Sequence, residues 1–129
     1  MTLPCCATWD DNGVIAETPL MRAVLDAYPV TDGHVLIVPK RHVVRFVDLT
    51  TDEILEMFDL IEGTVRTIIT DTADFTIAVN DGPAAGRTVP HLHVHVIPRR
   101  AGDVADPRGG VRQLLVPAGQ DPWINREDA

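Results

Sequence analysis

Three of the chain's five histidines lie at alternate positions of one short segment, with aliphatic residues between them: His91, His93 and His95. Side chains of a β-strand point alternately to its two faces, so this spacing predicts a strand with three imidazoles on one face and aliphatic side chains on the other. An imidazole can attack, donate a proton or bind an anion near neutral pH. The segment therefore predicts a chemical site.

Two other roles are compatible with the histidine row. Three surface histidines opposite a core face would be purely structural. Two histidines that are two residues apart on a strand can also bind zinc with a third ligand. However, three residues along one strand span about 13 Å, too far to converge on one ion, and no carboxylate lies within several residues on either side. We therefore expect metal-free chemistry.

Composition and charge limit the partners of this chain. Its 129 residues suffice for one domain with a core. Lys+Arg 11 against Asp+Glu 19 gives a net charge of −8, which disfavours nucleic-acid polymers but leaves room for a small phosphorylated ligand. There is no apolar run of roughly 18–20 residues and no signal peptide over Met1 to Asp11. The adjacent cysteines Cys5 and Cys6 cannot build a disulfide framework. We expect a cytoplasmic protein without membrane contact.

Hydrophobic periodicity and turn residues predict an α+β fold with a mostly antiparallel sheet. A capping box from Thr50 to Glu53 begins one long helix that ends near Thr70 and Asp71. The whole chain, 1–129, reads as a single domain with short extensions at 1–12 and 117–129. Strands are expected at Val14–Glu17, Leu20–Leu25, His34–Val38, Phe75–Val79 and the histidine segment, with a possible extra strand at Val111–Val116.

A loop rich in glycine and alanine, Asn80–Thr88, leads directly into the histidine segment. Glycines allow backbone N–H groups to approach a ligand closely, and such turns can form anion-binding nests. Asn80 and Thr88 add neutral donors, and Arg87 adds a cation. Next to three aligned histidines, this loop is interpreted as half of a phosphate site.

The segment Asn-Asp-Gly-Pro-Ala-Ala-Gly-Arg-Thr-Val-Pro-His-Leu-His-Val-His-Val-Ile-Pro-Arg, residues 80–99, resembles the signature of the histidine triad (HIT) superfamily. A second block agrees with it: Asp26, the turn 29–33 and the strand-like stretch 34–42. The resemblance covers about residues 14–116. It implies a HIT-like fold with a five-stranded antiparallel sheet and one long helix.

The resemblance also implies an enzyme that acts at the α-phosphate of a nucleotide. The middle histidine of the triad, His93, would attack the α-phosphorus and form a covalent nucleotidyl-imidazole, which water then resolves. His95 would contact phosphate oxygens and His91 would orient the array. A nucleophilic imidazole must be neutral, and a protonated neighbour would favour the anionic transition state.

The family pattern assigns further residues to substrate binding. Asn80, Gly86 and Thr88 match positions at the phosphate or leaving group, and Asp26 matches the acid that accepts both ribose hydroxyls. Arg87 stands where the family usually has glutamine. We hypothesise that it favours substrates with an anionic leaving side; the alternative is an arginine that points to solvent.

Two assignments remain open at this stage. Leu20, Val35 and Ile37 are either part of a nucleoside pocket or plain core, and core is the safer assignment. Some relatives hold structural zinc through a Cys-x-x-Cys pair and two histidines. The matching residues would be Cys5, Cys6, His42 and His91, but adjacent cysteines chelate one ion poorly, so we expect no metal or other cofactor to be required.

Within the superfamily, the sequence resembles the fragile-histidine-triad branch most, which implies hydrolysis of dinucleoside polyphosphates. Hydrolysis of nucleoside 5′-phosphoramidates is the first alternative. A non-catalytic nucleotide sensor is an alternative of another class. The resemblance further implies a homodimer, whereas base preference, leaving group and physiological substrate stay open.

Overall fold

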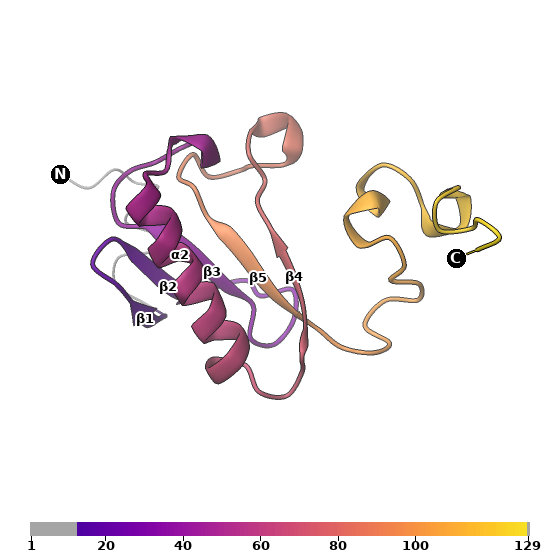
Figure 1. Ribbon diagram of the computed structural model, residues 1–129, viewed down its shortest axis with the longest axis horizontal. Coiled ribbons are helices and arrows are strands. Elements are labelled where there is room, and N and C mark those ends of the chain that lie inside the picture. Colours follow the sequence, from indigo (N-terminus) through magenta and orange to yellow (C-terminus); the bar gives the residue numbers. More distant parts are fainter. Residues whose placement is uncertain (1–12, 129) are drawn as a thin grey trace. The chain divides into compact units, whose positions relative to one another are not determined.

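The computed structural model describes residues 13–128, which fall into two compact units divided between Arg99 and Arg100. The first unit contains one five-stranded antiparallel sheet with the strand order β1-β2-β3-β5-β4 (Figure 1). Its strands are β1 (Val14–Glu17), β2 (Met21–Leu25), β3 (Val35–Pro39), β4 (Asp74–Ala78) and β5 (Val94–Arg99). The predicted fold class is therefore confirmed.

Helix α2 (Thr51–Gly63) begins at the predicted capping box. The hydroxyl of Thr50 accepts a hydrogen bond from the Glu53 N–H at 3.2 Å, and the Glu53 carboxylate accepts one from the Thr50 N–H at 2.9 Å. These reciprocal bonds satisfy N–H groups that a helix start otherwise leaves unpaired. The helix continues as a π-helical turn, Thr64–Ile68, and so ends close to the predicted position.

The sheet carries apolar side chains on both faces, but α2 lies across only one of them (Figure 1). Alternate residues of β3 and β5 face the helix and form the main core with it. The opposite face carries a smaller apolar cluster of Val24, Leu36 and Val38, against which Val14 and Val89 pack. Leu36 lies directly opposite His95 in the sheet, so this second face is the one that bears His95.

Strand β5 begins at Val94 rather than at His91, so the prediction of one strand through all three histidines is wrong in part. The backbone N–H of Leu92 donates instead to the carbonyl of Val43 at 2.6 Å. His91 and His93 therefore lie in the connection that enters the strand, and only His95 lies on the ladder itself. The alternation still holds from Leu92 onward, because Leu92, Val94 and Val96 all belong to the main core.

The second unit contains short 3-10 helices in its described residues, including Gly110–Leu114. The extra strand expected at Val111–Val116 is therefore wrong. Gly109 and Gly110 both have positive φ, +85° and +49°, which turns the chain out of an extended path at this point. The Arg112 guanidinium then pairs with the buried Asp121 carboxylate at 2.6 Å and 2.9 Å.

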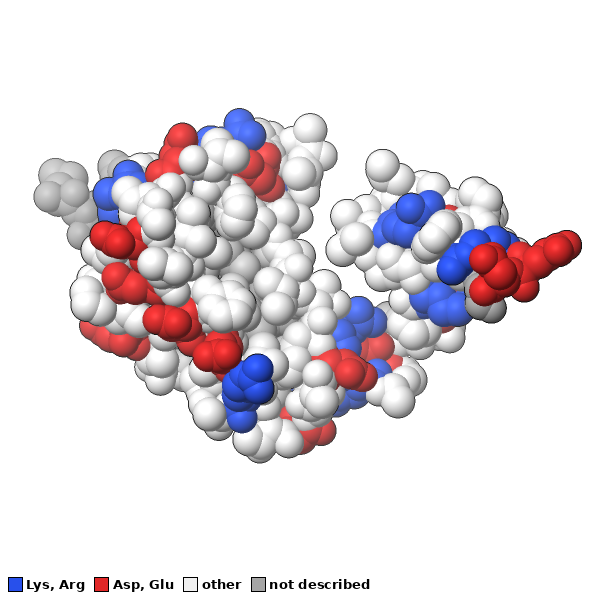
Figure 2. All heavy atoms as spheres, in the orientation of Figure 1, with Lys and Arg blue, Asp and Glu red and all other residues white. Residues whose placement is uncertain are grey.

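Acidic side chains gather along one side of α2, beside an uncharged surface (Figure 2). No helix in the described part of the chain has both the length and the apolar character needed to cross a bilayer.

Candidate active site

His93 lies just before β5 and is half-buried. Its Nδ1 atom is 2.8 Å from the carbonyl oxygen of His91. A carbonyl oxygen can only accept, so Nδ1 carries the hydrogen and a neutral His93 keeps its lone pair on Nε2. The backbone thus selects the tautomer whose outer nitrogen is a nucleophile.

His95 is the neighbour of His93 at this site. Their ring centroids are 5.1 Å apart, with an interplanar angle of 69°. On its other side, His95 Nδ1 lies 2.9 Å from Nε2 of His34, a residue 61 positions away in the sequence. His34 itself is 3% exposed. A third imidazole, that of His34, therefore adjoins His95 on the side away from His93.

Burial first, and then the neighbouring His93 and His34, lower the pKa of His95 from 6.5 to about 4, against the opposing effect of Asp26. Burial also lowers the pKa of His34, with Asp26 again opposing. Both side chains are therefore neutral at neutral pH in the free protein. The expectation of a protonated imidazole beside the nucleophile is not met by His95, which can act as a neutral N–H donor.

Asp26 follows β2 and lies next to this histidine pair. One of its carboxylate oxygens accepts the Tyr28 N–H at 2.9 Å, and the other is 3.5 Å from His34 Nε2. The backbone N–H of Asp26 donates to the His34 carbonyl at 2.9 Å, which fixes the two residues together. The predicted ribose-binding acid is thus brought to the site, with its carboxylate only 19% exposed.

These side chains could also hold a metal ion, because one ligand atom each from Asp26, His34 and His95 lies within 4.8 Å of the others. A metal at that point would have to displace the hydrogen bond between the two histidines. The geometry as it stands is that of a hydrogen-bonded cluster.

The His91 ring does not stand in a row with the other two histidines. It is 2% exposed, its Nε2–H donates to the carbonyl of Pro39 at 2.9 Å, and its Nδ1 lies 3.3 Å from Nδ1 of His42. The contacts therefore show His91 contributing to the site through its carbonyl oxygen, which orients His93. Cys5 and Cys6, the other ligands of the zinc alternative, lie outside the described residues.

The glycine loop before the histidines forms a 3-10 turn, Pro83–Ala85. The N–H groups of Ala85 and Arg87 both donate to the Gly82 carbonyl at 3.1 Å, and that of Gly86 donates to the Pro83 carbonyl at 3.0 Å. These three donors are used within the loop. A phosphate nest in this loop would therefore have to use other N–H groups, and the phosphate-binding role of the loop stays a prediction.

The same loop follows directly on β4, the strand that pairs with β5. Ala78 pairs with His95 across β4 and β5, and the half-buried Asn80 lies two residues further along the chain. Gly86 lies against Asn80, since a Cβ at Gly86 would be 4.0 Å from the Asn80 Cγ. Thr88 is exposed at the end of the loop, and its predicted role at the leaving group stays a prediction.

Arg87 is half-buried, and its Nη1 atom is shielded from solvent without a hydrogen-bond partner in the described part of the chain. The guanidinium adds to the effects that lower the pKa of Asp81, which come first from the hydrogen bond of Arg45. A buried cationic nitrogen that lacks an acceptor is costly unless an anion completes it. This geometry disfavours the alternative of an arginine that simply points to solvent.

Two groups of residues near the site were not predicted from the sequence. His34 was assigned only to a strand, and the signal for its role was its presence in the second family-like block. The apolar cluster on the histidine face consists of Val24, Leu36 and Val38 rather than Leu20, Val35 and Ile37. The latter three pack in or against the main core, which confirms their assignment to the core.

Comparison with known proteins identifies the family. The model of the HIT domain matches residues 9–102. The chain is 40% identical over 96 residues to the bifunctional bis(5'-adenosyl)-triphosphatase/adenylylsulfatase FHIT of Arabidopsis thaliana, covering 73% of this chain and 53% of that protein. It is 37% identical over 95 residues to the asymmetrical bis(5'-nucleosyl)-tetraphosphatase of Schizosaccharomyces pombe, covering 72% and 52%.

A solved structure agrees with these sequence matches. The Caenorhabditis elegans NitFhit protein superposes with a TM-score of 0.68 at 40% identity, over 78% of this chain and 24% of that one. This chain therefore belongs to the HIT family, and it resembles members of the fragile-histidine-triad type. It spans about half the length of the two curated relatives described above.

Proposed function

We propose that this protein hydrolyses dinucleoside polyphosphates at the α-phosphate through a covalent intermediate on His93. The observation that carries the proposal is the hydrogen bond from His93 Nδ1 to the His91 carbonyl, which sets the tautomer with its lone pair on Nε2, the form that a nucleophilic imidazole requires. The names of the relatives support the substrate class, because those proteins are a triphosphatase and a tetraphosphatase of bis-nucleosides.

In the first step, His93 Nε2 forms a bond to the α-phosphorus while the bond from that phosphorus to the bridging oxygen breaks. The remaining nucleoside polyphosphate leaves as an anion. In the second step, water attacks the same phosphorus, loses a proton to solvent and displaces the imidazole. The products are a nucleoside monophosphate and the regenerated His93.

The other site residues stabilise charge or hold the nucleotide. His95 offers a neutral N–H to a phosphate oxygen, and the buried Arg87 Nη1 donates a hydrogen bond to the anionic leaving group. Asp26 accepts the ribose hydroxyls. Asn80, with Gly86 packed against it, and Thr88 bind the phosphate or leaving group.

The base would pack near the apolar cluster on the histidine face. Leu36 lies opposite His95 in the sheet and contacts Val24 and Val38 in that cluster. This nonpolar cluster lies on the same face of the sheet as His95.

We propose that the reaction needs no metal ion, since Arg87 and the N–H groups of neutral imidazoles can supply the required electrostatics. The zinc alternative through Cys5, Cys6, His42 and His91 is tested separately by elemental analysis of protein purified without chelator. Less than one zinc per ten chains supports the proposal, and stoichiometric zinc contradicts it.

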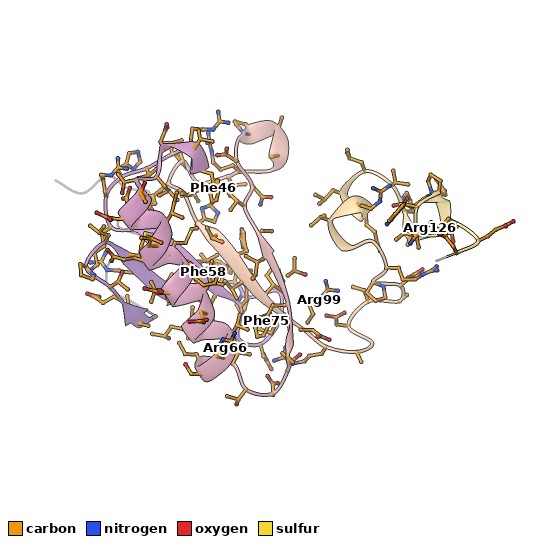
Figure 3. All side chains as sticks on the ribbon, viewed as in Figure 1. Phe46, Phe58, Arg66, Phe75, Arg99 and Arg126 are labelled. Atoms are coloured by element: carbon orange, nitrogen blue, oxygen red, sulfur yellow. The ribbon has the colours of Figure 1, made fainter. Side chains whose placement is uncertain are left out.

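We also propose that the protein is a cytoplasmic homodimer. Strand β4 forms an edge of the sheet in the described structure, and Ile77 on it is 50% exposed. Leu55 and Phe58 on α2 are each 60% exposed, and Figure 3 labels Phe58 on that helix. Large apolar side chains on an open edge strand and on an exposed helix face are typical of a surface that a second copy covers. Sedimentation equilibrium tests this point.

A substrate panel tests the reaction class. The protein is incubated with diadenosine triphosphate, diadenosine tetraphosphate and adenosine 5′-phosphoramidate, and release of adenosine monophosphate is followed. Faster turnover of the polyphosphates supports the proposal. Preference for the phosphoramidate favours the phosphoramidase alternative, and tight binding of all three without turnover favours the nucleotide sensor.

A further inference from the structure

We propose that His34 is a positioning residue that fixes the tautomer of His95, so that His95 presents an N–H and never a lone pair to the substrate. The inference rests on the proposed function, because it concerns the phosphate donor of that same site. It is carried by a chain of three hydrogen-bonding groups that begins at a backbone amide.

The first link is the backbone N–H of Val30, which donates to Nδ1 of His34 at 3.2 Å. An amide N–H can only donate, so His34 Nδ1 must hold a lone pair. A neutral His34 then carries its hydrogen on Nε2. Because His34 is 3% exposed and burial lowers its pKa, the neutral form is the one present at neutral pH.

The second link is the contact of 2.9 Å between His34 Nε2 and His95 Nδ1. Since Nε2 of His34 carries a hydrogen, it donates, and Nδ1 of His95 accepts. The reverse direction would require a hydrogen on Nδ1 of His34, where it would face the hydrogen of the Val30 amide. The direction of the chain is therefore fixed by the backbone.

The third link follows from the first two. A neutral His95 that accepts at Nδ1 must carry its hydrogen on Nε2. His95 therefore offers the opposite tautomer from His93, which has its hydrogen on Nδ1 and its lone pair on Nε2. Two adjacent histidines are thus held as one nucleophile and one donor, and neither can exchange roles without breaking a hydrogen bond.

The turn at Val30 contributes to this chain of hydrogen bonds through its backbone and not through the Val30 side chain. The Val30 side chain is 73% exposed, whereas the His34 N–H donates to the Thr31 carbonyl at 3.1 Å and closes the turn. Asp26 lies 3.5 Å from the same Nε2 of His34. The carboxylate assigned to the ribose therefore adjoins the hydrogen that orients the phosphate donor.

The direct test is the tautomer of His95 in ligand-free protein, read from imidazole ¹⁵N chemical shifts at neutral pH. We expect a protonated, pyrrole-type Nε2 and an unprotonated, pyridine-type Nδ1. The same spectrum of a His34→Leu variant, which cannot donate, should show His95 in exchange between both tautomers. His34→Gln keeps an N–H donor at about the same reach and should restore the single tautomer.

Kinetics give the second readout. His34→Leu should lower kcat for a dinucleoside polyphosphate about 10- to 100-fold with a much smaller change in KM, since a transition-state donor is lost. His34→Gln should recover most of that loss. In a His95→Leu background, His34→Leu should have no further effect, because its action passes through His95. Multiplicative losses in the double variant would overturn the proposal.

A backbone variant covers the case in which His34→Leu does not fold. Val30→Pro removes the one amide hydrogen that sets the chain, and Val30→Ala keeps it as the matched control. Exchange of the His95 tautomers in the first and not in the second supports the proposal. A wild-type His95 with its hydrogen on Nδ1 refutes it even if the protein is a hydrolase, whereas the predicted tautomer without any nucleotide turnover refutes only the proposed function.

Discussion

The Nδ1 atom of His93 lies 2.8 Å from the backbone carbonyl oxygen of His91, two residues earlier in the chain. Because the acceptor is a carbonyl, the contact holds in only one tautomer, and that tautomer has its lone pair on the outer nitrogen. The buried ring of His91 anchors this carbonyl through its hydrogen bond to Pro39. The tautomer that the proposed nucleophile requires is therefore already set in the ligand-free protein.

Arg87 should determine the preference for anionic leaving groups. We expect Arg87→Gln to lower kcat/KM for diadenosine triphosphate about tenfold more than for adenosine phosphoramidate, because one charged hydrogen bond to a phosphate is worth about 1.5–3 kcal/mol. Arg87→Lys keeps the charge and should lose less. Equal effects of Arg87→Gln on both substrates would show that Arg87 does not contact the leaving group.

The free energy of unfolding should decrease as the pH is lowered through the range in which His95 titrates. The unfolded side chain takes up a proton near pH 6.5 and the folded one near about 4, so protonation favours the unfolded state between these values. The contribution of His95 is complete above pH 6.5 and is lost as the pH falls. It amounts to roughly 1–3 kcal/mol after allowance for relaxation. Urea titrations at pH 7, 6 and 5 measure this, and a His95→Gln variant should show a flatter dependence.

The carboxylate of Asp26 should raise the pKa of both neighbouring imidazoles. Its charge opposes the effect of burial on His34 and on His95, so Asp26→Asn should lower the pKa of both further. An NMR pH titration of the histidine side chains measures the change. The same variant should raise KM for nucleotides, since it alters the proposed ribose acceptor, and an unchanged KM would contradict that assignment.

The start of α2 should contribute to stability without affecting the chemistry. Glu53 is 2% exposed, completes the capping box and pairs with Arg41 at 2.8 Å. Glu53→Ala removes both interactions and should lower the free energy of unfolding by about 2 kcal/mol. Asp52→Ala, in the same helical turn but exposed, should cost only about 0.5 kcal/mol. A chemical denaturation series distinguishes the two, and similar losses would contradict this account of Glu53.

The parts of the fold that depend on local sequence were predictable. The capping box at Thr50 and Glu53 and the apolar run of β3 act within a few residues, and both lie where the sequence places them. Periodicity alone predicts an extra strand at Val111–Val116, which the structure does not contain. There, two glycines with positive φ and the ion pair of Arg112 with Asp121 decide the conformation.

The residues of the site also divide into those that local spacing predicts and those that long-range contacts place. His93 and His95 could be found from their spacing, but the position of the His91 ring depends on Pro39, 52 residues away in the sequence. The role of His34 depends on a hydrogen bond across 61 residues. Such long-range contacts leave no periodic signal in one sequence. They determine how the imidazoles are placed and which tautomer each one adopts.

The covalent intermediate on His93 is tested most directly by intact-mass analysis during turnover of a slow dinucleoside polyphosphate analogue, followed by mapping of the modified peptide. The account predicts a mass increase of one nucleotidyl group, located on His93 and absent from His93→Ala. An unmodified protein at steady state together with retained turnover in His93→Ala would show that this imidazole is not the nucleophile.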